Sequence, residues 1–217
     1  MSTSVQPLVL MTAGGTGGHV YPALAVATEL MARGLRVEWV GTARGLEHRV
    51  VPAAGITLHC LPVRGVRGKS VVDKLLGVWL LLVASVQALW LLYRLSPGCV
   101  VGMGGYVAGP AGVAAWLLRK PTVIHEQNSV PGLANRKLGT LVKKVCLSLP
   151  QSEHYFPAGK TVLTGNPVRD TIVAVGNDDS TTRQKKTLVV LGGSQGAHAV
   201  NTLMIDALEA NRERFSG

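Results

Sequence analysis

A short apolar run that breaks into a glycine-rich loop and continues as a helix restricts the fold of this chain more than any other feature. Leu8–Thr12 has the composition of a buried strand, and the segment 14–18 that follows reads Gly-Gly-Thr-Gly-Gly. Helical spacing then runs from Pro22 to Arg33 and ends at Gly34. This order of strand, glycine loop and helix is the opening of a βαβ unit.

Short apolar runs and helical segments continue to alternate along the chain. The further predicted strands are Arg36–Val40, Ile56–Leu61, Val100–Met103, Thr122–His125, Lys144–Leu147 and Lys160–Leu163, and the further predicted helices include Leu46–Ala54 and Gly109–Leu118. Such alternation is typical of parallel sheets. The sequence therefore predicts an α/β, Rossmann-like domain over residues 1–169.

The opening pattern recurs near the end of the chain. Residues 170–186 are interpreted as a polar linker, and they precede a predicted strand at Thr187–Leu191. A glycine loop at 192–196 and a predicted helix at Ala197–Leu208 follow. We expect residues 187–217 to be the first strand and helix of a second Rossmann-like domain, truncated in this chain.

Leu75–Tyr93 contains no charged residue and is long enough to cross a membrane as a helix. It lies between two predicted strands of one sheet, however, and both strands must lie on the same side of a bilayer. We therefore expect the helix to lie on a membrane surface, with three tryptophans as interfacial anchors and nearby cations facing anionic lipid. The anchors are Trp79, Trp90 and Trp116, and the cations are Arg64, Arg67, Lys69 and Lys74. A wholly buried core helix is the alternative.

Three glycine loops occur where strands end, at 14–18, 102–105 and 192–196. Glycine lets the backbone approach a ligand, and a helix N-terminus offers N–H groups to phosphate. The dinucleotide fingerprint fails because Val20 stands where its third glycine belongs, and a P-loop fails because no Gly-Lys-Ser/Thr follows the glycine loops. Each loop alone is explained by a tight turn, whereas the set favours a phosphate-containing ligand.

The formal net charge of +10 favours an anionic partner. Nucleic acid is not expected, because the basic residues are scattered and no zinc-finger or RNP-like pattern occurs. Cys60, Cys99 and Cys146 show neither CxxC spacing nor a histidine at the spacing of a metal ligand, so neither disulfides nor zinc are predicted. The N-terminus lacks the positive flank of a signal peptide, which predicts a cytoplasmic protein.

Five motifs occur in order along the chain: GGTGGH at 14–19, GMGGY at 102–106 with Gly109-Pro110, HEQN at 125–128, GNPVR at 165–169 and GGSQGA at 192–197. In their order and spacing they resemble the motifs of the MurG family of glycosyltransferases. The resemblance implies a GT-B architecture, with two Rossmann-like domains facing across a cleft. It also implies transfer of N-acetylglucosamine from UDP-N-acetylglucosamine to the C4 hydroxyl of undecaprenyl-pyrophosphoryl-N-acetylmuramyl-pentapeptide (lipid I), which gives lipid II for peptidoglycan synthesis. The protein would then be peripheral on the cytoplasmic side of the membrane, at its anionic inner leaflet.

The same resemblance assigns candidate ligand contacts. Those to UDP-N-acetylglucosamine are Thr16, Gly17, Gly18, Asn128, Arg169 and Ser194. Those to the acceptor pyrophosphate are Gly14, Gly15, Gly104, Gly105 and Tyr106. UDP-N-acetylglucosamine is a substrate, so no cofactor is expected, and because no D-x-D motif occurs, no metal is expected either.

The implied reaction inverts the anomeric carbon and requires a base. His19 follows the first glycine loop, where it has the position of a base, of a phosphate ligand or of a residue capping its own loop. Glu126 is the rival base, because it follows a strand at the ligand edge of an open α/β sheet; a salt bridge to an arginine is the alternative. Arg169 has the alternatives of capping a helix or holding the linker.

Two other classes of function remain open from the sequence. A non-catalytic, membrane-associated module that binds lipid pyrophosphate is the first, and a dinucleotide oxidoreductase is a more distant second. Because the second domain stops after one strand and one helix, we expect this chain alone to have little or no transferase activity.

Overall fold

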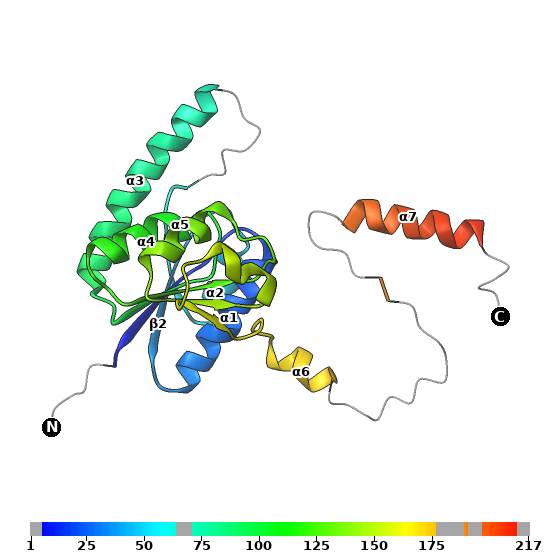
Figure 1. Cartoon of the computed structure of the whole chain (residues 1–217), viewed down its shortest axis with the longest axis horizontal. Helices are drawn as coiled ribbons and strands as arrows, with labels where there is room; N and C mark the ends of the chain where they lie inside the picture. Colours follow the sequence, from blue (N-terminus) through cyan, green and yellow to red (C-terminus); the bar gives the residue numbers. More distant parts are fainter. Residues whose placement is uncertain (1–5, 64–70, 177–188, 191–196, 212–217) are drawn as a thin grey trace. The chain divides into compact units, whose positions relative to one another are not determined.

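The computed structural model describes residues 6–63, 71–176, 189–190 and 197–211 (Figure 1). Residues 1–173 form one compact unit and residues 174–217 another. The predicted linker residues 177–186, the glycine loop 192–196 and the basic residues Arg64, Arg67 and Lys69 lie outside the described residues, as does the side chain of Lys74. Val189 and Val190, from the predicted strand 187–191, are exposed and belong to neither helix nor strand.

The first unit is built on one parallel sheet of seven strands in the order β3-β2-β1-β4-β5-β6-β7. The strands are β1 (Leu8–Thr12), β2 (Arg36–Gly41), β3 (Thr57–Cys60), β4 (Cys99–Gly102), β5 (Thr122–Glu126), β6 (Lys144–Leu147) and β7 (Thr161–Leu163). Every pairing between neighbouring strands is parallel. The predicted α/β class and parallel sheet are therefore confirmed.

Helices cover both faces of the sheet (Figure 1). They are α1 (Gly17–Ala32), α2 (Glu47–Ala53), α3 (Val71–Leu95), α4 (Ala108–Leu117) and α5 (Leu133–Leu141), with a 3-10 helix at Pro150–Tyr155. Successive side chains of β1 point to opposite faces of the sheet and so contact different helices. Val9 and Met11 pack with residues of α1 on one face. Leu10 packs with Ala84 and Ala88 of α3 on the other.

Several element boundaries differ from those predicted. Helix α1 begins at Gly17 instead of Pro22, because a search for apolar spacing does not register the two glycines and the histidine of its first turn. Helix α5 was not predicted, since its sequence has few apolar residues and contains Gly139. That glycine lets the helix pack against Phe156, whose ring would lie 2.5 Å from an added Cβ.

The predicted linker also begins as a helix. Residues Asp170–Gly176 form α6, and the carbonyl of Arg169 accepts hydrogen bonds from the N–H groups of Ile172 and Val173. The short apolar run Thr-Ile-Val-Ala-Val within this segment was not recognised as helical. In the second unit, the described helix α7 (Ala197–Ala210) agrees with the predicted helix 197–208.

Helix α3 joins β3 to β4 and docks on the sheet through small side chains. Ala84, Ala88 and Leu92 are fully buried, and the helix packs against α4. By length and composition α3 could span a membrane, and only 28% of its most apolar stretch is buried. The alternative of a wholly buried core helix is wrong.

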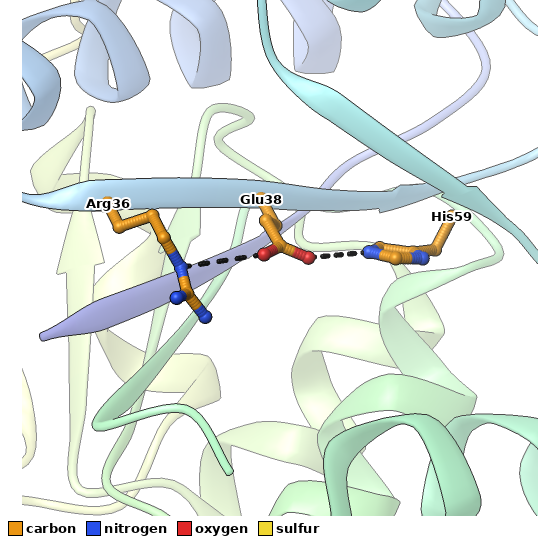
Figure 2. A network of polar contacts seen from close by, with 3 residues as sticks. All are labelled: Arg36, Glu38 and His59. Atoms are coloured by element: carbon orange, nitrogen blue, oxygen red, sulfur yellow. Dashed lines mark hydrogen bonds and ion pairs between the residues drawn. The ribbon is translucent and has the colours of Figure 1, made fainter. Parts of the chain in front are cut away.

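A polar network lies at the edge of the sheet (Figure 2). The Glu38 carboxylate on β2 lies 2.7 Å from Nε2 of His59 on β3 and 3.5 Å from Nε of Arg36. Partly exposed contacts of this kind stabilise a fold by roughly 0–1 kcal/mol. The network is thus a surface contact between the edge strand β3 and its neighbour β2.

Candidate active site

The candidate site lies where the strand order changes direction. The chain leaves β1 towards β2 and β3 on one side, and then crosses to β4 on the other. In open parallel sheets the loops after two such strands separate and leave a crevice for ligands. Here the loops after β1 and β4 are the first and second glycine loops predicted from the sequence.

The two glycine loops touch through their backbones. Gly105 has φ of +85°, and a Cβ added there would lie 2.3 Å from the carbonyl oxygen of Gly14. Gly104 also has a positive φ, and its added Cβ would lie 2.7 Å from Nδ1 of His19. Glycine is required at both positions because the second loop would otherwise collide with the first loop and with His19.

A buried carboxylate holds the first glycine loop. One oxygen of Glu47 accepts a hydrogen bond from the Gly15 N–H at 3.0 Å, and the other accepts from the N–H and hydroxyl of Thr42 at 2.9 and 2.7 Å. Glu47 is fully buried at the start of α2. The sequence analysis did not single it out, because an acidic residue in the first turn of a helix is common.

A cavity of about 570 Å³ opens beside the first glycine loop. Three predicted acceptor contacts, Gly14, Gly15 and Tyr106, line it together with Arg44 and with Leu80 of α3. The cavity thus joins the glycine loops to the apolar helix. Arg44 is exposed on its wall and was not predicted.

The first turn of α1 faces the same edge of the sheet. Thr16 is the N-cap residue with extended backbone, and its carbonyl accepts hydrogen bonds from the N–H groups of His19 and Val20. Gly17 and Gly18 therefore occupy the first helical positions, where N–H groups have no intrahelical acceptor. Such a helix start is suited to a phosphate or to sugar hydroxyls.

His19 and Glu126, the two candidate bases, have different surroundings. His19 is half-buried, and its Nδ1 lies 3.0 Å from Oε1 of Gln127. Glu126 is 1% exposed, and its carboxylate accepts hydrogen bonds from the backbone and side-chain N–H groups of Asn128 and from Nδ2 of Asn135, all at 2.9 Å. The partners of Glu126 are therefore amides, and the predicted alternative of an arginine is not what the structure shows.

Alternation along the end of β5 separates these side chains. His125 and Gln127 point to one side, where Nε2 of Gln127 lies 3.0 Å from Nδ1 of His125 and 3.1 Å from the Met103 carbonyl. Glu126 points to the other side, towards α5. Burial lowers the pKa of His125, an effect that its hydrogen bond to the Gly165 carbonyl and the nearby Glu126 carboxylate oppose.

Arg169 lies over the ring of Tyr21, with Cζ 4.5 Å from the ring centroid. This stacking brings Arg169, which follows β7, next to α1. A guanidinium stacked on an aromatic ring keeps its N–H groups free for an anion. The predicted contact Ser194 lies outside the described residues, and no three His, Cys, Asp or Glu side chains among the described residues are grouped closely enough to hold a metal ion.

Comparison with known proteins gives the same picture along the chain. Residues 9–147 match the glycosyltransferase family 28 N-terminal domain. A Pseudomonas savastanoi pv. phaseolicola protein named UDP-N-acetylglucosamine–N-acetylmuramyl-(pentapeptide) pyrophosphoryl-undecaprenol N-acetylglucosamine transferase is 48% identical over 200 residues, covering 92% of this chain and 56% of the relative. A protein of the same name from Chromohalobacter salexigens is 47% identical over 204 residues, covering 92% and 55%.

Solved structures give the same family relationship. The crystal structure of Acinetobacter baumannii MurG superimposes with a TM-score of 0.73 at 40% identity, covering 94% of this chain and 57% of that one. The UDP-GlcNAc 2-epimerase from Neisseria meningitidis bound to UDP-GlcNAc gives a TM-score of 0.55 at 17% identity, which is a likeness of fold alone. This chain spans a little over half the length of the relatives it matches.

Proposed function

The chain belongs to glycosyltransferase family 28, and we propose that it is the acceptor-binding portion of an inverting transferase that moves N-acetylglucosamine from UDP-N-acetylglucosamine to lipid I. The observation that carries the proposal is the meeting of the two glycine loops beside His19, at the mouth of a cavity that reaches α3. A lipid-linked pyrophosphate needs backbone donors for its phosphates and an apolar path for its chain. Both are adjacent here.

In the proposed reaction the C4 hydroxyl of the muramyl sugar attacks the anomeric carbon of the donor. The new C–O bond forms as the bond to the UDP oxygen breaks, so the leaving electron pair goes to the diphosphate and the hydroxyl proton goes to a base. We assign the base to His19 because the Glu126 carboxylate is buried and already accepts three amide hydrogen bonds. Glu126 then orients Asn128, a proposed contact of the donor sugar.

The diphosphate formed in this reaction carries negative charge that must be stabilised. The N–H groups of Gly17 and Gly18, which have no intrahelical acceptor, provide this together with the guanidinium of Arg169, which is distant in sequence but stacks on Tyr21 of the same helix. Thr16 supplies a hydroxyl at the same helix start. We propose that Gly14, Gly15, Gly104, Gly105 and Tyr106 contact the acceptor on the other side of His19, with Gly15 contributing no N–H donor because its N–H is bonded to Glu47.

Membrane contact through α3 is the second part of the proposal. Trp79 and Trp90 are 62% and 59% exposed on this helix, and Trp116 of the neighbouring α4 is 50% exposed. Trp116 also borders a cavity of about 380 Å³ whose wall includes Arg119, Lys120 and Lys143. Exposed tryptophans flanked by cations are typical of proteins that lie on anionic lipid surfaces. We propose the cytoplasmic face of the cell membrane as the location.

The transferase proposal is tested by transfer of labelled N-acetylglucosamine from UDP-N-acetylglucosamine to lipid I. The 217-residue chain is compared with a version extended by the remaining length of the Acinetobacter protein. We expect turnover in the extended protein only, and its loss in the His19→Ala variant. Lipid I binding without turnover in either protein would favour the non-catalytic module. Turnover by the 217-residue chain would overturn the proposal that this chain is only the acceptor-binding portion of the transferase.

Membrane contact is tested by co-sedimentation with vesicles that contain anionic phospholipid. We expect Trp79→Ala and Trp90→Ala to lower the bound fraction. Leu163→Ala is the matched control, because Leu163 is 60% exposed at the end of β7, remote from α3 in the sheet order. Equal binding by all three variants would contradict the proposed surface.

A further inference from the structure

Gln127 stands at the centre of a chain of hydrogen bonds that ends at His19. Its Oε1 lies 3.0 Å from His19 Nδ1, and its Nε2 lies 3.1 Å from the Met103 carbonyl and 3.0 Å from His125 Nδ1. His125 Nε2 in turn lies 2.9 Å from the Gly165 carbonyl. These contacts join the ends of β4, β5 and β7 to the first turn of α1.

The donors and acceptors of this chain have one consistent assignment. A carbonyl oxygen only accepts, so His125 carries its hydrogen on Nε2, facing Gly165, and its Nδ1 is an acceptor. The Met103 carbonyl likewise requires the amide nitrogen of Gln127 on its side, and this nitrogen has two hydrogens, one for each neighbour. The amide oxygen of Gln127 must therefore face His19.

An amide oxygen cannot donate, so His19 must carry a hydrogen on Nδ1. In the neutral ring the lone pair is then on Nε2. No described residue forms a hydrogen bond to His19 Nε2, whereas Gly104 closes against the Nδ1 side of the ring. The nitrogen able to accept a proton is thus the one left without a protein partner among the described residues.

We propose that Gln127 is a positioning residue that fixes His19 in the tautomer with hydrogen on Nδ1, with His125 and the Met103 carbonyl setting the orientation of the amide. The inference rests on the proposed role of His19 as the base, because it names the nitrogen that receives the acceptor's hydroxyl proton. An aspartate beside a catalytic histidine fixes the tautomer and also stabilises the imidazolium that forms. A neutral amide supplies the first effect and little of the second.

Burial is consistent with the same assignment. The lowered pKa of His125 keeps that ring neutral near pH 7, so that its Nδ1 lone pair remains available to the Gln127 amide. A protonated His125 would place a hydrogen on Nδ1 against the Gln127 amide nitrogen, and the amide would turn over. The tautomer of His19 therefore depends on a neutral His125.

The tautomer is measured by long-range ¹H–¹⁵N NMR of the ¹⁵N-histidine-labelled 217-residue chain above pH 7. We expect His19 Nδ1 in the protonated, pyrrole-like range and Nε2 in the unprotonated range. Gln127→Ala should shift His19 towards the form with hydrogen on Nε2, which free imidazole side chains favour. Gln151→Ala, which removes an exposed glutamine of the 3-10 helix, is the matched control and should leave the His19 signals unchanged.

Gln127→Glu keeps an acceptor for His19 Nδ1 and guards against a general packing effect of the alanine variant. We expect hydrogen on Nδ1 to be retained in this variant. Hydrogen on Nε2 of neutral His19 in the wild-type chain, or an unchanged tautomer in Gln127→Ala, would overturn the proposal.

The NMR measurement needs neither substrate, so it separates this inference from the proposed function. In the extended protein, Gln127→Ala should lower kcat by no more than the roughly 10²–10⁴-fold that a general base contributes, and should change the pH profile of kcat/KM. A changed tautomer with unchanged kcat would retain the hydrogen-bond chain and refute His19 as the base. An unchanged tautomer with lost activity would refute the positioning role alone.

Discussion

Gly105 provides the sharpest test of how the two glycine loops meet. Its backbone has φ of +85°, a conformation that costs an L-residue about 1–2 kcal/mol. An alanine Cβ would also lie 2.3 Å from the Gly14 carbonyl oxygen and 3.0 Å from the Gly14 nitrogen. Backbone atoms cannot rotate away as a side chain can, so one loop must shift, at a cost typical of overpacking of about 1–3 kcal/mol.

These two terms predict that Gly105→Ala lowers the free energy of unfolding by about 2–5 kcal/mol. Alanine also restricts the unfolded chain, which offsets about 0.4–1 kcal/mol of this loss. At roughly 2–4 °C per kcal/mol for a protein of this size, the midpoint of thermal unfolding should fall by several degrees or more.

Gly34→Ala is the matched control. Gly34 has φ of +79°, yet no atom lies within 4 Å of its added Cβ. Gly34→Ala therefore has the same cost of a positive φ and the same restriction of the unfolded chain as Gly105→Ala, but its added methyl group meets no neighbouring atom. Urea unfolding followed by circular dichroism should show Gly105→Ala less stable than Gly34→Ala by about 1–3 kcal/mol. Equal stability of the two variants would refute the close contact between the loops.

Three further predictions follow from buried and titrating groups. Glu47→Gln places an amide N–H₂ against a donor such as the Gly15 N–H, so urea unfolding should show a loss of about 1–3 kcal/mol in the free energy of unfolding. The control Glu29→Gln, at an exposed residue, should lose no more than about 1 kcal/mol. Similar losses in the two variants would contradict the structural role of Glu47. The pKa of His125 is lowered from about 6.5 in the folded chain, so the unfolded chain binds more protons between the two pKa values. The free energy of unfolding should therefore fall as the pH drops from 7 towards the folded-state pKa, and should fall less steeply in His125→Gln. Equal pH dependence in the two proteins would argue against a buried neutral ring. Partial burial and the Glu47 carboxylate raise the pKa of the Cys60 thiol, although the residue is accessible to solvent. Iodoacetamide should therefore alkylate Cys60 more slowly than free cysteine at pH 7.5. An equal rate of alkylation would contradict the raised pKa.

The family and the α/β class followed from local sequence signals. Apolar runs of strand length between helical segments predict a parallel sheet, because neighbouring parallel strands need a crossover connection, which is usually a helix. The glycine loops were recognised because glycine is the residue that permits positive φ, and Gly15, Gly104 and Gly105 do have it. Helices α5 and α6 were missed because segments of nine and seven residues are too short to be stable helices by themselves, so packing decides their structure.

The sequence by itself determined which residues are available at the site, whereas the tertiary structure decided what each one does. His19 follows a glycine loop and Glu126 and Gln127 stand at the end of a strand, and no spacing rule distinguishes the proposed base from the residues proposed to support it. Burial and the alternation of side chains along β5 separate their roles in the structure. The Glu126 carboxylate is enclosed by amide donors, and the Gln127 side chain points towards His19. The physical reason is that hydrogen-bond partners come from residues distant in sequence, such as Met103 and Gly165, which only the folded sheet brings together.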